Sequence, residues 1–217
     1  MKKSIIITLT LLIAFGLAGH AQSKSAASLQ IGVTLGLNAS NTSTGYGSGS
    51  NFKDPGMKLG GVIGAFVQIP LENKLSLQPE LLYSSEGSLQ EGKIGSTGNY
   101  VTIFTNKLGY LNIPVMLQYN ATGKGFFAEA GPQLGLLLSA KLKNAFPGSG
   151  AATETDTKDY MKSTNFGLGF GIGYNFNQAF GIGTRYIFGL SEVHDAIADM
   201  KVNTLRVGLH YKFSTGK

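Results

Sequence analysis

The stretch FGLGFGIGYNF, from Phe166 to Phe176, decides the fold of this chain. Its even positions all carry large apolar or aromatic side chains, whereas its odd positions carry glycine and one asparagine. Successive side chains of a β-strand point to opposite faces, so the alternation predicts a strand with one apolar and one nearly bare face. A sheet that spans a bilayer must close on itself and turn its apolar face to lipid, which accounts for both faces.

The same alternation recurs along the rest of the chain. Beyond residue 21 no apolar run approaches the length of about 18 residues that a membrane-spanning helix needs, which excludes a helical membrane protein. The expected strands are residues 29–37, 59–69, 75–85, 108–119, 126–140, 164–176, 180–190 and 203–213. The sequence therefore predicts an all-β fold, an eight-stranded antiparallel up-and-down transmembrane β-barrel.

The connections between these strands alternate in length. Long ones are expected at residues 39–56, 86–106, 141–162 and 191–202, and short ones at 70–74, 120–125 and 177–179. Short turns at one end and long loops at the other are typical of outer-membrane barrels, whose short turns face the periplasm. We therefore expect the four long loops to lie outside the cell.

The N-terminus has the features of an export signal. Lys2 and Lys3 precede an apolar run over residues 5–18, and small residues occupy the two positions before Gln22 that cleavage requires. The run is shorter than the roughly 20 residues of a membrane anchor. We expect a cleavable signal peptide at 1–21 and one barrel domain at 22–217.

Composition narrows the possible functions. Loss of Lys2 and Lys3 lowers the formal net charge from +6 to +4, and no basic run remains elsewhere, so we expect no nucleic-acid partner. The chain has no cysteine, which excludes disulfides, thiolate metal sites and a lipoprotein cysteine. A soluble lipocalin-like barrel is the main structural alternative. It would place Lys, Glu and Thr on one face of most strands, whereas this polar face is mostly Gly, Gln and Asn.

An eight-stranded barrel is only just wide enough for side chains to fill it. The odd-numbered glycines of the opening stretch should therefore make room for bulk from neighbouring strands, including Arg185. Aromatic residues near the short turns are expected to form an interfacial girdle: Tyr174, Phe176, Phe180, Tyr211 and Phe213.

Four charged residues fall on the inward face at similar depth: Glu80, Glu129, Arg185 and Arg206. Paired carboxylates can perform acid–base chemistry. Inside a narrow barrel that also holds arginines, however, a structural ion-pair network is favoured, because unpaired charge there is costly. We expect these four residues to form such a network.

Other motifs are weaker. GSLQEGKI (residues 87–94) resembles a phosphate-binding loop but lacks the Ser or Thr after its lysine, and the glycines of 167–173 never complete a dinucleotide-binding motif. Ser191, His194, Asp195 and Asp199 suggest a hydrolase or metal site, although polar loop composition explains them adequately. The acidic residues Glu154, Asp156 and Asp159 allow a loose calcium contact at most. We assign no catalytic, cofactor-binding or metal-binding residue.

Five segments together resemble a known family. They are LSLQPELLYSSEG (75–87), LGYLNIPVMLQY (108–119), FFAEAGPQLGLLLSAK (126–141), the opening stretch, and VGLHYKF (207–213). In this order they are similar to the porin-like outer-membrane β-barrel family of Bacteroidetes, which includes the PorT secretion proteins. The resemblance implies a barrel in the outer membrane of a Gram-negative bacterium and brings no catalytic residues. It also implies that the last strand is read by the barrel-assembly machinery, although the chain continues past Phe213.

These observations favour a scaffold in contact with outer-membrane lipid. Its loops would contact surface partners or components of a secretion or envelope assembly. A small-solute channel is the alternative, and an enzyme comes third. Interior charges flanked by the bulk of Tyr110 and Leu137 disfavour a wet lumen, and hence the channel.

Overall fold

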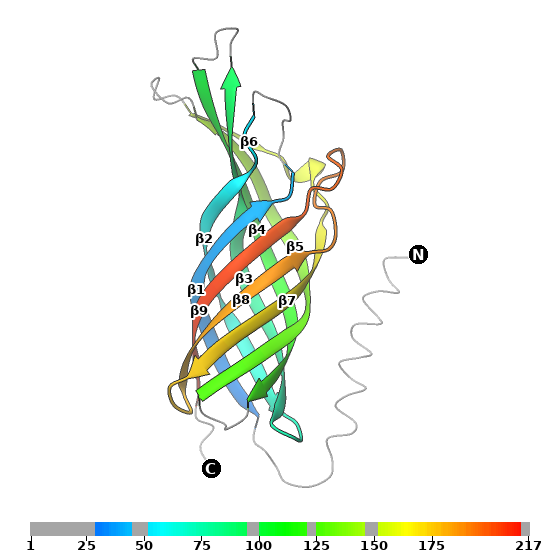
Figure 1. Cartoon of the computed structure of the whole chain (residues 1–217). Coiled ribbons are helices and arrows are strands. Elements are labelled where there is room, and N and C mark those ends of the chain that lie inside the picture. The colour runs from blue at the N-terminus through cyan, green and yellow to red at the C-terminus, as the bar shows by residue number, and fades with distance from the viewer. Residues whose placement is uncertain (1–28, 45–51, 95–99, 121–124, 146–151, 214–217) are drawn as a thin grey trace, which may run out of the picture.

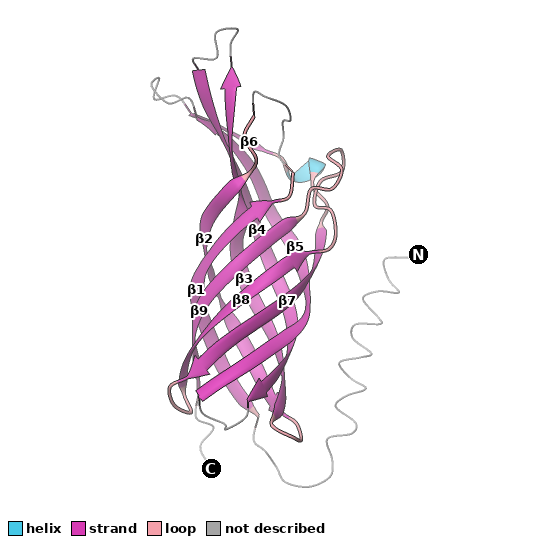
Figure 2. Ribbon diagram, viewed as in Figure 1, coloured by secondary structure: helices cyan, strands magenta, loops and turns pink. Residues whose placement is uncertain are grey.

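Long antiparallel strands dominate the computed structural model, which describes residues 29–44, 52–94, 100–120, 125–145 and 152–213 (Figure 2). One short 3-10 helix, η1 (Lys158–Tyr160), accompanies them in the described residues. The strands are β1 (Gln30–Thr42), β2 (Gly56–Pro70), β3 (Leu75–Ile94), β4 (Tyr100–Asn120), β5 (Gly125–Ala145), β6 (Ala152–Asp156), β7 (Thr164–Asn175), β8 (Phe180–Gly189) and β9 (Val202–Lys212).

Eight of these strands close into an up-and-down barrel (Figure 1). Each pairs with its neighbour along the wall, β5 pairs with both β4 and β7, and β1 pairs with β9 to complete the ring. All of the pairings are antiparallel, with for example Leu35 opposite Leu209 across the β1–β9 ladder. Every wall strand thus has two partners, and the wall has no free edge whose backbone groups would be exposed to lipid.

The opening stretch places its two kinds of residue on opposite sides of this wall. Phe170 and Ile172 face outward with exposed fractions of 48% and 62%. The inward side of Gly171 touches the side chain of Glu129, and that of Gly173 touches Phe127, so a Cβ atom at either glycine would overlap its neighbour. The prediction that glycine makes room for bulk from other strands is confirmed.

Aromatic side chains gather on the outside at the end of the barrel that carries the short turns, here called the turn end. Ring centroids of Tyr174 and Phe176 lie 5.5 Å apart, those of Phe180 and Tyr211 4.8 Å, and those of Tyr211 and Phe213 5.2 Å. All five belong to the predicted girdle, and such aromatic rings favour the boundary between hydrocarbon and water.

The opposite end, here called the loop end, is more regular than the sequence predicted. Residues 86–106 were expected to form a long loop, yet β3 and β4 pair as far as Ile94 and Tyr100 and project as a ribbon beyond the wall (Figure 1). The segment 87–94 is thus a strand and not a loop. Residues 141–162 contain the additional strand β6, which pairs with β5. Polar residues occur on both faces of β6 and of the outer part of β3, and apolar residues occur on both faces of the outer part of β4, so the apolar–polar alternation stops although the strands continue.

Residues 1–28 lie outside the described residues, and with them the predicted signal peptide at 1–21 and the expected start at Gln22. Within the described part of the chain, no helix has the length and apolar character to cross a membrane.

Candidate functional site in the barrel lumen

Arg185 of β8 joins two carboxylates inside the barrel. Its Nη1 and Nη2 donate to the two carboxylate oxygens of Glu80 at 3.0 and 2.7 Å, and its Nε donates to Glu129 Oε1 at 2.6 Å. Glu80 and Arg185 are 7% and 8% exposed. Such two-pronged, charge-assisted contacts are among the strongest hydrogen bonds in proteins, and they hold β3, β5 and β8 together across the lumen.

Amide side chains extend this contact to other strands. Gln78 Nε2 donates to Glu80 at 2.9 Å, Gln118 Nε2 donates to Glu129 at 2.8 Å, and Gln68 Nε2 donates to Gln118 at 2.8 Å. We call this set the lumen network: Glu80, Glu129, Arg185, Gln68, Gln78 and Gln118. It draws on five of the eight wall strands, so it crosses the lumen as a hydrogen-bonded layer.

Arg206 is not joined to a carboxylate in the described structure, although the sequence predicted that it would be. It lies directly opposite Arg185 in the β8–β9 ladder, and its Nε donates to Asn38 Oδ1 at 3.2 Å. Its Nη1 and Nη2 have no hydrogen-bond partner among the described residues. The predicted network is therefore corrected to three charged residues, because both carboxylates are bound by Arg185.

Glu86 is a buried lumen carboxylate that the sequence analysis overlooked. It is 2% exposed and accepts hydrogen bonds from Ser84 Oγ at 2.7 Å and Asn112 Nδ2 at 2.8 Å. Asn38 in turn donates to Ser84 at 2.6 Å, which connects Glu86 to the side chain that accepts from Arg206. The sequence predicts a loop from residue 86 onward, but the even spacing of Glu86 from Glu80 along β3 is a signal that both side chains face the lumen.

An apolar cluster packs at the loop end of the barrel, where its member Leu108 is in register with the buried Glu86. It is built by β4, β5 and β9 together with the connections before β7 and after β8. We call it the cap, and its buried members are Leu108, Tyr110, Leu137, Ala140, Met161, Val193, Met200 and Val202. The cap is not predictable from the sequence pattern, because its loop residues stand singly in polar segments.

Backbone hydrogen bonds hold the loop part of the cap in place. Val193 N–H donates to Met200 O at 2.8 Å, and Lys162 N–H donates to Val193 O at 3.0 Å. Beside them, Lys162 Nζ and Glu192 form an ion pair of 2.8 Å. The connection after β8 is thereby folded onto the connection before β7, which positions Val193 and Met200 over the lumen.

The four residues that suggested a hydrolase or metal site have contacts that shape this loop. His194 Nδ1 accepts hydrogen bonds from the N–H groups of Ala196 and Ile197 at 3.0 and 3.1 Å. Ser191 Oγ accepts one from Phe166 N–H at 2.8 Å. Asp195 and Asp199 are exposed. Throughout the described ranges, no three His, Cys, Asp or Glu side chains are grouped as metal ligands.

Two groups in this loop have altered pKa values. Burial disfavours the imidazolium form and lowers the pKa of His194. A hydrogen bond from Lys162 and another from the Asp199 N–H lower the pKa of Glu192, since both stabilise its carboxylate. At neutral pH the loop therefore holds a neutral histidine and an ionised glutamate.

The acidic loop residues considered for calcium do not form a calcium site in the described structure. Glu154 of β6 accepts hydrogen bonds from Lys107 Nζ at 2.7 Å and Lys141 Nζ at 2.9 Å. These two ammonium groups lower the pKa of Glu154 to about 2. Its carboxylate is thus paired with two lysines of the neighbouring strands.

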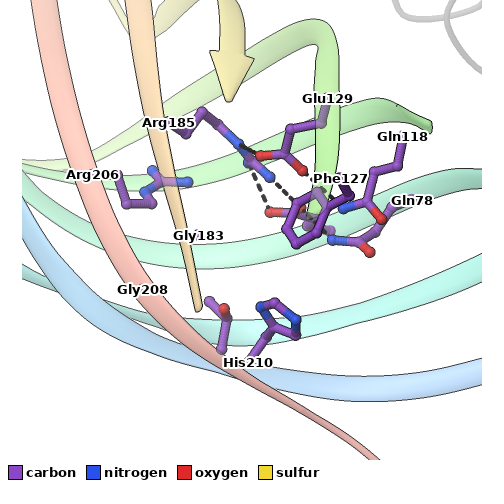
Figure 3. A pocket seen from close by; sticks show the side chains of 11 residues that line it. Gln78, Gln118, Phe127, Glu129, Gly183, Arg185, Arg206, Gly208 and His210 are labelled. Carbon is purple, nitrogen blue, oxygen red and sulfur yellow. Dashed lines mark hydrogen bonds and ion pairs between the residues drawn. The ribbon is translucent and has the colours of Figure 1, made fainter. Parts of the chain in front are cut away.

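A small polar cavity of about 50 Å³ lies beside the lumen network toward the turn end (Figure 3). Glu80, Glu129 and Arg185 line one side of it, and Arg206 and His210 line another. A cavity needs about 10 to 15 Å³ to hold one water, so this space accommodates a few waters. It is far smaller than the continuous channel of a porin.

Comparison with known proteins agrees with this architecture. The family model described as outer membrane protein beta-barrel domain matches residues 20–195. The chain belongs to this family. The protein is therefore an outer-membrane β-barrel of a Gram-negative bacterium, and we expect its loop end to be extracellular, as in such barrels generally.

No curated protein matches the chain. Among solved structures, Ail of Yersinia pestis is 14% identical with a TM-score of 0.44, covering 86% of this chain and 99% of Ail. Neisserial surface protein A is 14% identical with a TM-score of 0.43, covering 85% and 97%. The N-terminal barrel domain of Pseudomonas aeruginosa OprF is 13% identical with a TM-score of 0.37, covering 86% and 100%.

Proposed function

We propose that this barrel is a non-conducting scaffold whose extracellular segments bind a protein partner. The observation that carries the proposal is the filling of the lumen at two levels. The charge-paired lumen network crosses its interior, and the apolar cap packs at its loop end. An eight-stranded barrel leaves space only for side chains, so these two layers oppose the passage of hydrated ions.

The ribbon formed by the outer parts of β3 and β4 is the best candidate for partner binding. It extends beyond the wall, where its outward residues Glu91 and Lys93 are exposed (Figure 1). Phe52 braces its outer part through a bridge with Gly92 and a ring contact with Phe104, whose centroid lies 6.2 Å away. A braced ribbon loses less conformational freedom on binding than a flexible loop, which favours recognition by a partner protein.

The finer family assignment follows from the ordered sequence segments described above. They favour a PorT-like member from Bacteroidetes, and hence a partner within a secretion or envelope assembly. They also favour a non-enzymatic role. That role agrees with the contacts of Ser191 and His194, which support the loop backbone.

A small-solute channel is the second candidate, and the cavity beside Arg206 is the observation in its favour. A transport path would need a polar space of this kind, next to a guanidinium whose two Nη groups have no hydrogen-bond partner among the described residues. For conduction, however, both the lumen network and the cap would have to open, which makes the channel the weaker proposal.

Site-specific photo-crosslinking in the native cell envelope tests the scaffold proposal. A photoreactive residue at Glu91 or Lys93 should capture a defined envelope protein, whereas one at Asn73, in the periplasmic turn, should not capture the same protein. Identical products from both ends, or none from the ribbon, would argue against partner binding through the ribbon. Ion-current recording on the wild-type protein tests the closed lumen separately.

A further inference from the structure

Arg206 brings a buried positive charge to the polar cavity of the lumen. The residue is 5% exposed, lines the cavity of about 50 Å³, and directs its guanidinium into the lumen (Figure 3). Its Nε donates to Asn38, whereas its Nη1 and Nη2 have no hydrogen-bond partner in the parts of the chain that the structure describes. A buried guanidinium whose N–H groups lack acceptors is costly, so this side chain needs an acceptor from another source.

The carboxylates that line the same cavity already accept hydrogen bonds from other groups. Both oxygens of Glu80 accept from Arg185. Glu129 accepts from Arg185 through Oε1 and from Gln118 through Oε2. All four carboxylate oxygens are thus bound to donors other than Arg206.

Glu86, the third buried carboxylate of the lumen, is not among the described residues that line the cavity. It accepts hydrogen bonds from Ser84 and Asn112. Asn38 donates to Ser84 and accepts from Arg206, so these two neutral side chains lie between Glu86 and the guanidinium. Glu86 therefore does not supply the missing acceptor.

The charges of the described residues around the cavity favour an anion. Strand alternation turns Lys212 to the same inward side of β9 as His210 and Arg206, and Lys212 lies further toward the turn end. Lys212, Arg185 and Arg206 therefore oppose only the two carboxylates of the cavity, which leaves one positive charge in excess even when His210 is neutral. His210 is partly exposed, so the turn end is the side from which an ion can enter.

We infer that the cavity binds one small monovalent anion of the halide class, such as chloride, at the Nη groups of Arg206. A halide accepts their hydrogen bonds and also compensates the buried charge, which a water molecule does not. Because a halide ion is only slightly larger than a water, a cavity that accommodates a few waters can hold it together with one or two of them. A divalent oxyanion such as sulfate is both larger and more highly charged than this site requires.

This ion site belongs to the interior of the barrel, so it goes beyond the proposed scaffold function and does not depend on a partner at the extracellular segments. A barrel without any partner could still bind the ion, and a partner-binding barrel could hold only water in the cavity. The two proposals therefore fail in different experiments.

X-ray diffraction from crystals of the purified protein grown in sodium bromide tests the inference directly, because the anomalous scattering of bromide distinguishes it from water. One anomalous peak should lie within hydrogen-bond distance of Arg206 Nη1 or Nη2. The peak should disappear in Arg206→Met and persist more weakly in Arg206→Lys, which keeps the charge. An ordered water at this position without bromide would overturn the inference, as would bromide found only at exposed lysines.

The unfolding temperature provides the matching measurement in solution. Replacing gluconate, a monovalent anion too large for the cavity, with bromide at equal ionic strength should stabilise the wild-type protein, since a ligand of the folded state raises its stability. In Arg206→Met the apparent affinity for bromide should fall about tenfold or more, the loss expected when a charge-assisted hydrogen bond is removed. In gluconate the two proteins should differ mainly by the hydrogen bond to Asn38.

Lys158→Met is the matched control, because it makes the same charge change at an exposed position of the loop end. It should keep the wild-type response to bromide. Equal stabilisation of wild type and Arg206→Met by bromide would assign the effect to the protein surface and would overturn the inference.

Discussion

Arg185 and Arg206 face one another directly across the β8–β9 ladder, yet within the described structure only Arg185 is bound to carboxylates. Like charges at directly opposed positions of a sheet are unfavourable unless other groups compensate them. Glu80 and Glu129 compensate Arg185, whereas the two Nη groups of Arg206 face the polar cavity (Figure 3). The two arginines therefore have different energetic roles, and their substitution should have different effects.

Arg185→Ala should strongly destabilise the barrel. The substitution leaves Glu80 and Glu129 buried without their cation, and removing one partner of a buried ion pair typically costs about 3 to 5 kcal/mol. The protein is incubated at increasing temperatures and then run on a gel, where the unfolded barrel migrates more slowly than the folded one. The temperature at which half of the protein is unfolded should fall clearly. A change as small as that of an exposed ion pair, about 1 kcal/mol or less, would mean that water reaches these carboxylates.

Arg206→Met should have a much smaller effect on the same measurement. It keeps most of the side-chain volume and removes a buried charge whose Nη groups have no partner in the described structure. The main loss is the hydrogen bond to Asn38, worth about 1 kcal/mol. If Arg206→Met were as destabilising as Arg185→Ala, Arg206 would belong to the ion-pair network that the sequence predicts.

Protonation of Glu154 should loosen the β5–β6 hairpin only in strong acid. Its pKa is lowered to about 2 by Lys107 and Lys141, so the ionised form stabilises the hairpin. That stabilisation is complete above the ordinary pKa of 4.5 and is lost as the pH falls toward about 2. Carboxyl NMR should show a titration midpoint near 2, and Glu154→Gln should remove the transition from β6. A midpoint at 4.5 would show that the two ion pairs do not form in solution.

Acidification should release the loop part of the cap. His194 Nδ1 can accept the N–H groups of Ala196 and Ile197 only while it is unprotonated. Because the pKa of His194 is lowered, the stabilisation is complete above the ordinary value of 6.5 and is lost as the pH falls through the lower folded value. Hydrogen exchange at Ala196 and Ile197 should accelerate correspondingly.

His194→Asn is the control for this prediction. An asparagine side chain can accept the same backbone N–H groups but does not titrate, so protection should persist at low pH. Protection at Ala196 and Ile197 that falls equally in both proteins would assign the effect to another group, of which Glu192 and Asp195 are the nearest candidates.

The sequence predicts those parts of the fold that the bilayer constrains. The strand expected at 164–176 is found as β7 (Thr164–Asn175), because its outward residues must be apolar and its inward ones small. Beyond the bilayer that constraint ends. The outer part of β3 reads EGSLQEGKI, that of β4 reads YVTIFT with apolar side chains on both faces, and β6 reads ATETD. None of them shows the apolar–polar alternation that distinguishes a strand from a loop.

The sequence predicts which charged side chains face the lumen, but it does not predict which of them form ion pairs. Strand alternation correctly directs Glu80, Glu129 and Arg185 inward, and similar depth brings them together. Depth alone does not show that one guanidinium binds both carboxylates and leaves Arg206 beside the cavity. The cap depends on Met161 and Met200, which come from separate connections, so its formation follows from tertiary packing that no local pattern reveals.

The closed lumen is tested most directly by ion-current recording on the purified wild-type protein in planar lipid bilayers at neutral pH. With the lumen network and the cap both in place, the protein should insert without producing any steady conductance. Two results together would contradict the closed scaffold and establish a water-filled path through the barrel: reproducible, steady ion currents from correctly folded wild-type protein, and an unfolding temperature that Arg185→Ala hardly changes.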